Sequence, residues 1–452
     1  MIFPLFIFLI ALLAAGSLWI GAKTVVTSGN HEDYFLAGRK LGIFSLAMTL
    51  LATQLGGGII IGTADEAYRS GWIVIFYPLG MALGLFILGL GFGAKIRKLN
   101  VTTIAEIFQQ LYQSIFLRKF ASLLSIISLF LILVGQGIAA RMFFYSVGLQ
   151  NDLVFIFFWI VLIIYTVFGG LKAVVYTDIL QACFIVLSFV VAFLSIPERV
   201  PHFLSEVSLF ATDAPPWLTW LSMPLLYILI GQDMGQRCAS ALKPRTITLA
   251  CFYATLITVI VGFVPVYIGV SAQQSGLEFS EGTSVLISYL TQRVNPVVST
   301  FIIVAVFMAI ISTADSLLCS ISSNIAIDFD LLKNRSVNFS RFVTLFVGLT
   351  TLIVSLYMHD IVQILMFSYE LAVSILFIPI LMGVIQSKPS RLGAILAMTF
   401  SGIAFLWIES SPYKYISILG IGALAYGVGI LYQTLQTSPQ SEALPNQSEE
   451  SI

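Results

Sequence analysis

The chain has 452 residues, of which 58% are hydrophobic and only 10% are charged, with no net charge. Soluble proteins average about 25% charged residues, so the composition excludes a soluble domain and predicts an all-α polytopic membrane protein. A transmembrane β-barrel is excluded because barrel strands alternate polar and apolar residues over about ten positions. No basic patch points to nucleic acid. The four cysteines are scattered in or beside apolar runs, so we expect no disulfide framework.

Apolar runs of about 20 residues, long enough to cross a bilayer, recur along the whole chain. We predict 13 transmembrane helices, at 2–24, 42–64, 73–94, 119–148, 151–169, 174–196, 217–235, 247–274, 296–327, 341–358, 360–386, 391–408 and 413–433.

Loop charge gives the orientation. If the N-terminus lies outside, 17 of the 22 lysines and arginines fall on the inside, as the positive-inside rule favours. We therefore predict a multi-pass protein of the cell (plasma or inner) membrane with a cytoplasmic C-terminus. We expect residues 1–434 to form one transmembrane domain, and 435–452 to form a polar, acidic, disordered tail.

The middle of the chain divides into two units of five spans each, 42–196 and 217–386. An odd number of spans gives the second unit the opposite orientation. Each unit opens with a glycine-interrupted span, at Gly56-Gly57-Gly58 and at 231–235 (GQDMG). Glycine-broken spans at matching positions in two halves indicate the binding site of a secondary transporter.

The first interruption lies in ATQLGGGIIIGTADEAY. A broken helix there would free the carbonyls of Ala52 and Leu55, although glycines also allow close helix packing in membranes. Gln54, an amide beside the break, favours a binding site, to which we also assign Gly56 and Gly57.

A second polar group, Ser312, Thr313 and Asp315, lies within a long apolar run. Polar residues in hydrocarbon tend to mark ion or substrate pathways. Serine and threonine hydroxyls can instead bond to a carbonyl one turn earlier. Their adjacency, with Ala309 one turn before, favours ligation of a hard cation such as Na+ by hydroxyls of one helix and freed carbonyls of another.

Several other polar residues lie within the predicted spans. Asp178 is either a dipole partner in an early helical turn or part of the inner ion path, and Glu370 is either a structural acid or a solute contact. Gln136 and Gln232 are candidate solute contacts, while Arg141 either contributes to this region or extends to the interface. The chain has no Walker motif, metal-ligand spacing or catalytic constellation, so we expect no enzyme.

Four segments together resemble the sodium:solute symporter family, which includes proline, pantothenate, sugar and choline transporters. They are EDYFLAGRKLG, ATQLGGGIIIGTADEAY, IYTVFGGLKAVVYTDILQ and AIISTADSLLCSISSNIAID, in the order and spacing of the family. The resemblance covers most of residues 30–390. It implies the leucine-transporter-type fold, with two inverted five-helix repeats.

The resemblance also implies one Na+ site, with Asp178 near the inner path of the ion. Carried over position by position, its ligands are the carbonyls of Ala52, Leu55 and Ala309 and the hydroxyls of Ser312 and Thr313.

The solute is less defined. The broken helix and the FQQLY segment are similar to high-affinity choline transporters, but Gln54 replaces their tryptophan and GQDMGQR lacks the aromatic expected in the seventh span. Because quaternary ammonium groups are usually held by aromatic cages, an amino acid such as proline is at least as plausible.

We therefore predict a Na+-coupled symporter that imports a small polar organic solute by alternating access. The partners expected are this solute and membrane lipid, with no nucleic acid and no obligate protein. One alternative is a proton-coupled symporter, with Asp178, Asp315 or Glu370 carrying the proton. Another is a transporter-like solute sensor that does not transport.

Overall fold

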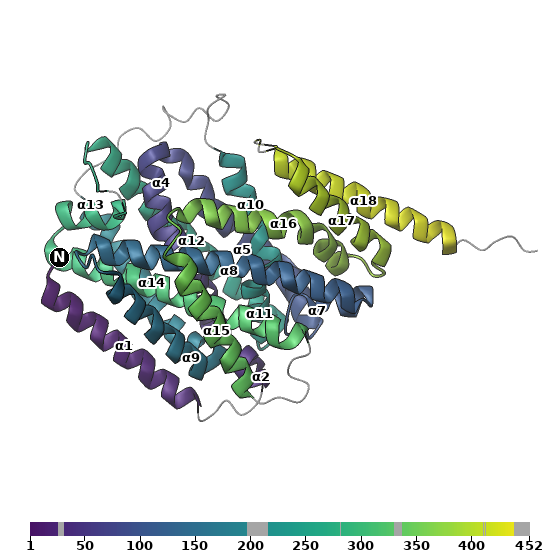
Figure 1. Ribbon diagram of the computed structural model, residues 1–452, viewed down its shortest axis with the longest axis horizontal. Coiled ribbons are helices and arrows are strands. Elements are labelled where there is room, and N and C mark those ends of the chain that lie inside the picture. The colour runs from purple at the N-terminus through teal and green to yellow at the C-terminus, as the bar shows by residue number, and fades with distance from the viewer. Residues whose placement is uncertain are drawn as a thin grey trace, which may run out of the picture.

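The computed structural model describes residues 1–25, 31–196, 216–280, 282–329, 337–409, 411 and 413–437. Within these ranges the chain is helical, with one isolated backbone bridge between Leu41 and Ala241 (Figure 1). Most of the predicted tail lies outside the described residues.

The structure contains the following α-helices in chain order. They are α1 (Phe3–Val25), α2 (His31–Leu36), α3 (Ile43–Gln54), α4 (Thr63–Ser70), α5 (Phe76–Ile87), α6 (Gly93–Lys98), α7 (Glu106–Tyr112), α8 (Ile115–Ser146), α9 (Asp152–Ser195), α10 (Trp217–Ile230), α11 (Gln232–Ser240), α12 (Pro244–Gln274), α13 (Val285–Arg293), α14 (Pro296–Ser323), α15 (Val337–Ser355), α16 (Ile361–Ile385), α17 (Arg391–Trp407) and α18 (Lys414–Thr437).

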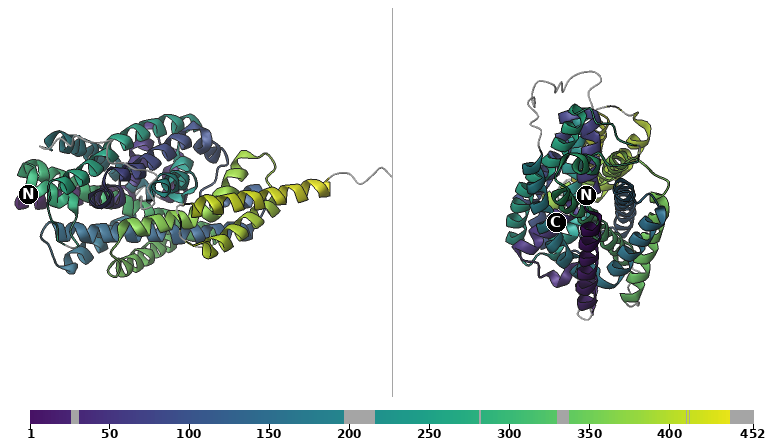
Figure 2. Two further views of the ribbon diagram at one scale, coloured as in Figure 1. Left: turned by 90° about the horizontal axis from the view of Figure 1, so that it is seen from above. Right: turned by 90° about the vertical axis from the view of Figure 1, so that its left-hand side faces the viewer.

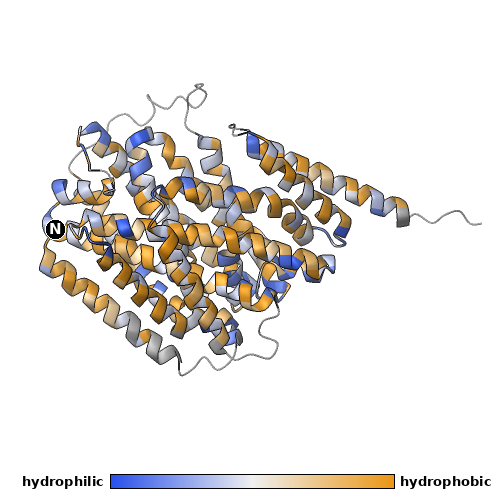
Figure 3. Cartoon of the chain, viewed as in Figure 1, coloured by the Kyte–Doolittle hydropathy of each residue, from blue (hydrophilic) through white to orange (hydrophobic). Residues whose placement is uncertain are grey.

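Seven helical segments of the described chain are long and apolar enough to cross a membrane, and six shorter apolar helices accompany them. Each of the predicted spans overlaps one of these segments. Large apolar side chains such as Phe116, Leu194 and Trp407 remain exposed on the surface, where lipid can cover them. Hydrophobic residues predominate along the helices (Figure 3). The prediction of an all-helical polytopic membrane protein is confirmed.

Helix starts and kinks have local causes. The side chains of Asn295, Asp360 and Ser390 accept backbone N–H groups at the starts of α14, α16 and α17, as N-cap residues do. Within α9, Gly170 has φ +58°, so this helix consists of two segments that meet at the predicted turn. A Cβ at Gly170 would lie within 3 Å of Tyr34, so only glycine fits there.

The broken helix α3–α4 and helix α14 lie among α8, α9, α11 and α12, while α5 packs along α10. The last two helices, α17 and α18, pack on each other and on α16. Seen from above, α18 extends beyond the rest of the bundle (Figure 2). The predicted site therefore lies inside the main bundle, away from the C-terminal pair.

We predict that Gly80→Ala destabilises the contact between α5 and α10. A Cβ at Gly80 would lie 2.3 Å from the Leu221 carbonyl oxygen, so the two backbones would have to separate. Overpacking of this kind typically costs about 1–3 kcal/mol, which thermal unfolding in detergent would detect. Gly420→Ala is the matched control, because no atom lies within 4 Å of its Cβ position. Equal stability of the two variants would contradict the prediction.

Candidate functional site

The helix break predicted at the triple glycine is present. Helix α3 ends at Gln54, Leu55 has a non-helical backbone (φ −80°, ψ 50°), and the Gly56 N–H donates to the Gln54 carbonyl at 2.9 Å. A wide π-type turn, Gly58–Gly62, then leads into α4. Such turns are rare within helices and occur often at functional sites.

Close packing explains the three glycines themselves. A Cβ at Gly56 would lie 2.6 Å from Thr313 Oγ1, and one at Gly57 would lie 2.3 Å from Ala139 Cβ on α8. At Gly58 the nearest atom, a methyl carbon of Leu365 on α16, would be at 2.2 Å. The glycines therefore let the broken helix pack closely against α14, α8 and α16. Close packing and ligand binding at this segment are thus compatible.

Helix α14 directs two buried hydroxyls at the end of α3. Ser312 Oγ donates to the Ala52 carbonyl at 3.1 Å, and Thr313 Oγ1 reaches the same oxygen at 3.1 Å. Ser312 also lies 3.2 Å from the Ala309 carbonyl, and Thr313 lies 3.2 Å from the Thr53 carbonyl. The predicted bond to a carbonyl one turn earlier thus exists for Ser312, together with the contact across to α3.

This arrangement suits a small hard cation. Hydroxyl oxygens have lone pairs, so a cation among them and the carbonyls can replace the hydrogen bonds that the hydroxyls now donate. Unwound backbone carbonyls serve the same purpose in other secondary transporters. Four of the five proposed ligand residues meet here, and the fifth, Leu55, is buried in the adjoining break.

A buried charged network lies beside this site. Thr49 Oγ1 donates to Asp178 Oδ2 at 2.5 Å, and the Arg237 guanidinium lies 3.7 Å from the same carboxylate. Arg237 also donates to the Thr49 carbonyl at 3.2 Å and to Ser316 Oγ at 2.6 Å. Asp178 is about two turns past Gly170, which is too far for an early-turn dipole contact.

One residue of this region differs from its sequence-based interpretation. Arg237 follows the predicted span 217–235 and so was expected among the cytoplasmic loop charges, but it is fully buried, pairs with Asp178 and donates to the Asp233 carbonyl. Asp315, on α14, accepts a hydrogen bond from the Tyr165 hydroxyl on α9.

A narrow cavity adjoins the hydroxyl site, with a volume of about 20 Å³, or about 350 Å³ when the open space around it is included. Its lining includes Thr313, which also belongs to the hydroxyl site, and Gly56, which packs against Thr313. The lining residues are Thr53, Gln54, Gly56, Gly58, Ile59, Tyr77, Met81, Ile132, Gln136, Tyr227, Asp233, Thr313, Leu317, Leu365 and Tyr369.

The predicted solute residues separate into two groups. Gln54, Gly56 and Gln136 line the cavity, and the Gln136 side chain accepts the Gly57 N–H at 2.8 Å. The other three, Gly57, Gln232 and Glu370, are not in the lining. The Gln232 amide binds the Ile104 N–H, the Thr102 carbonyl and Ser323 Oγ, whereas Glu370 is half-buried on α16 and not in the cavity lining.

Four further cavity side chains that can contact a solute were not predicted from the sequence: Tyr77, Tyr227, Tyr369 and Asp233. Asp233 could have been predicted from the sequence, because it lies in the predicted second break, where Gly231 separates α10 from α11. The tyrosines could not, since aromatic residues are common throughout the apolar runs of this chain.

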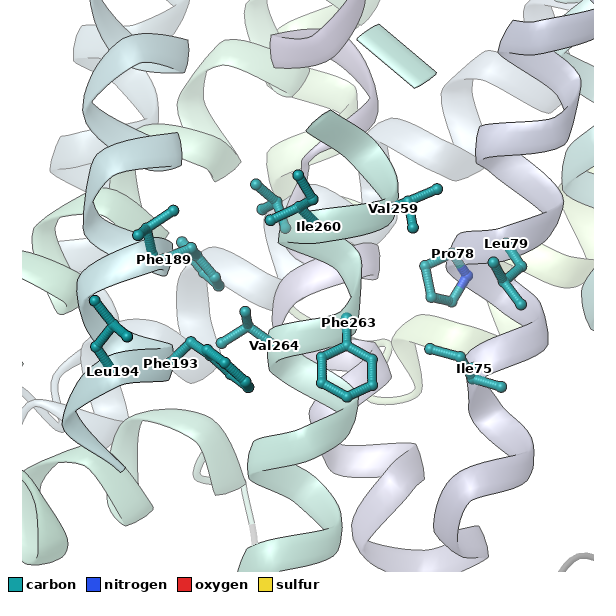
Figure 4. A pocket seen from close by; sticks show the side chains of 12 residues that line it. Ile75, Pro78, Leu79, Phe189, Phe193, Leu194, Val259, Ile260, Phe263 and Val264 are labelled. Carbon is teal, nitrogen blue, oxygen red and sulfur yellow. The ribbon is translucent and has the colours of Figure 1, made fainter. Parts of the chain in front are cut away.

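A wider vestibule of about 1310 Å³, including open solvent, lies at the α4 end of the break. Charged side chains, among them Asp65, Arg69 and Arg141, line it. Arg141 forms an ion pair with Asp152 at 2.8 Å. Another pocket, between α5, α9 and α12, has only apolar side chains, such as Phe189, Phe193 and Phe263, and so offers nothing to orient a polar solute (Figure 4).

Curated proteins with similar sequences are transporters. The human "High affinity choline transporter 1" is 26% identical over 462 residues, covering 92% of this chain and 77% of the relative. The "Sodium/pantothenate symporter" of Escherichia coli (strain K12) is 22% identical over 448 residues, covering 91% and 92%.

Solved structures agree on the fold. The substrate-bound, outward-open state of a Na+-coupled sialic acid symporter matches with a TM-score of 0.75 at 18% identity, covering 96% of this chain and 98% of that one. The transporter Mhp1 in a closed conformation matches with a TM-score of 0.62 at 16% identity, covering 92% and 98%.

A family model for sodium:solute symporters matches residues 34–401. The match confirms the resemblance drawn from the four motifs. It also confirms that the protein is a membrane transporter and not an enzyme, that its partner is a small-molecule solute, and that Na+ is the coupling ion. The chain belongs to the sodium:solute symporter family.

Proposed function

We propose that this protein imports a small organic solute by Na+-coupled alternating access, with Na+ bound between α3 and α14. The observation that carries the proposal is the convergence of the Ser312 and Thr313 hydroxyls on the Ala52 carbonyl at the helix break. The full ligand set comprises the carbonyls of Ala52, Leu55 and Ala309 with the two hydroxyls.

The proposed architecture has thirteen transmembrane helices and two inverted five-helix repeats, over 42–196 and 217–386. The seven long and six shorter apolar helices support this count. The repeats are supported by their matching breaks, one between α3 and α4 and one between α10 and α11.

Coupling follows from the atoms that the two sites share. Na+ would hold α3 against α14 and thereby position Gly56 and Thr313, which also line the central cavity. A solute in that cavity would in turn stabilise the same helix contact. By thermodynamic linkage, each ligand then raises the affinity for the other by the same factor.

We propose that the conformation is outward-facing. Just before α3, the Leu41 N–H donates to the Ser240 carbonyl at 3.1 Å, and the Leu41 carbonyl accepts the Leu242 N–H at 3.0 Å, which closes this end. Arg237 joins α11 to α3 and α14. The opposite end has the vestibule. We infer that loss of Na+ to the cytoplasm releases α3 and opens the closed end.

The proposed orientation, with the N-terminus outside and the C-terminus in the cytoplasm of the cell membrane, can be tested at the two ends of α12. In a cysteine-free background, we predict that Lys243→Cys reacts with an impermeant thiol reagent only from the cytoplasmic side. Ser280→Cys, beyond the other end of α12, should react from outside. Both positions are exposed, and labelling with the sides reversed would overturn the orientation.

For the ion site, we predict that Ser312→Ala combined with Thr313→Ala strongly lowers Na+ affinity while the helix is retained. Each lost bond to a charged group costs about 1.5–3 kcal/mol, or roughly tenfold to over a hundredfold in affinity. The measurements are Na+-dependent thermal stabilisation of the purified protein and Na+-driven uptake in proteoliposomes.

The matched control is Ser322→Ala on the same helix. Its hydroxyl donates to the Leu318 carbonyl at 2.6 Å and contacts Thr344, away from α3. Na+ affinity should be unchanged in this variant. If the double variant kept normal Na+ dependence, the site would lie elsewhere, and uptake driven by a proton gradient without Na+ would favour the proton-coupled alternative.

A further inference from the structure

We propose that the solute is a small organic cation, whose ammonium group is held by Asp233 and by the rings of Tyr77, Tyr227 and Tyr369. This inference rests on the proposed transport function and extends it by naming the class of solute.

Asp233 is the anionic part of the proposed site. It lies in the first turn of α11, directly after the break at Gly231, and only 4% of it is exposed. It lines the central cavity, and its Oδ1 atom has no hydrogen-bond partner among the described residues. A buried carboxylate oxygen without a partner is costly, so a positively charged or hydrogen-bond-donating group in the cavity would stabilise Oδ1.

Arg237, one turn later, does not fill this role. Its Nη1 donates to the backbone carbonyl of Asp233 at 2.9 Å and not to the carboxylate. Its ion pair is with Asp178, and Nη2 is bound to Ser316. The α11 N-terminus favours a nearby anion through its dipole, but it supplies no full counter-charge.

The balance of buried charge gives the same result. Among the described residues, the buried pair of Arg118 and Asp328 is self-contained, with 2.9 Å between Nε and Oδ1. The other buried charged groups are one guanidinium, Arg237, and the three carboxylates of Asp178, Asp233 and Asp315. Arg237 forms an ion pair with Asp178, and the Tyr165 hydroxyl donates a hydrogen bond to Asp315. Asp233 is left facing the cavity without an ion-pair partner in the described part of the chain.

Three tyrosines supply the aromatic part. Tyr77 on α5, Tyr227 on α10 and Tyr369 on α16 are all buried and line the cavity with Asp233. The rings of Tyr227 and Tyr369 are 4.6 Å apart between centroids. Aromatic faces attract cations, and the attraction is stronger when water is excluded.

The anionic and aromatic parts meet at Gly231. A Cβ at this glycine would lie 2.6 Å from Asp233 Oδ1 and 3.0 Å from Tyr227 Cε1, so the carboxylate and the ring flank the same point. Because Asp233 and Tyr227 also line the same cavity, an ammonium group in the cavity can contact both. The carboxylate of a zwitterion would bring a like charge toward Asp233, so the geometry favours a cation over an amino acid such as proline.

The first test compares matched solutes. Choline and glycine betaine share a trimethylammonium group, but betaine adds a carboxylate; ethanolamine carries a protonated primary ammonium, and proline is a zwitterion. We expect Na+-driven uptake, and thermal stabilisation in Na+, from at least one of the two cations at concentrations at least tenfold lower than for betaine or proline. The two cations distinguish a methylated head group from a protonated one.

The outcomes separate the two proposals. The cation proposal would be overturned if Na+ stabilised the protein but choline and ethanolamine had no effect, or if the zwitterions had stronger effects than the cations. Na+ coupling would remain supported in either case. Loss of Na+ dependence altogether would overturn the proposed function instead.

The second test removes the charge. Asp233→Asn keeps the size of the side chain, so we expect at least a tenfold loss of affinity for the preferred cation with Na+ stabilisation retained. The ratio between choline and its uncharged isostere 3,3-dimethyl-1-butanol should also fall, which a merely structural role would not cause. Equal weakening of both compounds would contradict the proposal.

Asp360→Asn is the matched control. It removes an exposed carboxylate at the start of α16, the helix that carries Tyr369, and asparagine also caps helices well. Cation affinity and the choline-to-isostere ratio should stay unchanged in this variant.

Discussion

The contact between the end of α3 and the middle of α14 is the interaction on which the other features depend. One carbonyl, that of Ala52, receives two hydroxyls from α14, and this is possible only because α3 stops there. The glycines that follow let the chain leave the helix and still pack against α8 and α16. A bulkier residue at any of the three positions would separate the helices and disperse the oxygen atoms.

The same break would join the proposed ion and solute sites. Because Thr313 belongs to both and Gly56 packs against it, no separate relay between them would be needed. The second break, at Gly231, places Asp233 opposite the first, and the three tyrosines of α5, α10 and α16 complete the cavity wall. Each of the two discontinuous helices thus contributes polar groups: the first supplies carbonyl oxygens to the proposed Na+ site, and the second supplies the Asp233 carboxylate to the cavity.

Residues that differ in chemistry from an apolar run around them could be predicted from the sequence. Consecutive glycines and adjacent hydroxyls are rare in such runs, so the helix break and the Ser312–Thr313 pair were predicted. Gln232 was preferred to its neighbour Asp233, but successive residues on a helix point about 100° apart, and only Asp233 faces the cavity. Arg237 was assigned to a loop because local charge cannot reveal a partner such as Asp178, 59 positions away.

The buried ion pair of Arg237 and Asp178 has a consequence for the order of events during transport. The pair joins α9 to α11, and separating these helices in a dry interior would leave both charges uncompensated, which typically costs about 3–5 kcal/mol when one partner is lost. Water that reaches the pair first removes most of this cost. For the proposed opening toward the cytoplasm, we therefore expect hydration of the Arg237 guanidinium to precede movement of α11, so that the rate of release depends on how readily water enters.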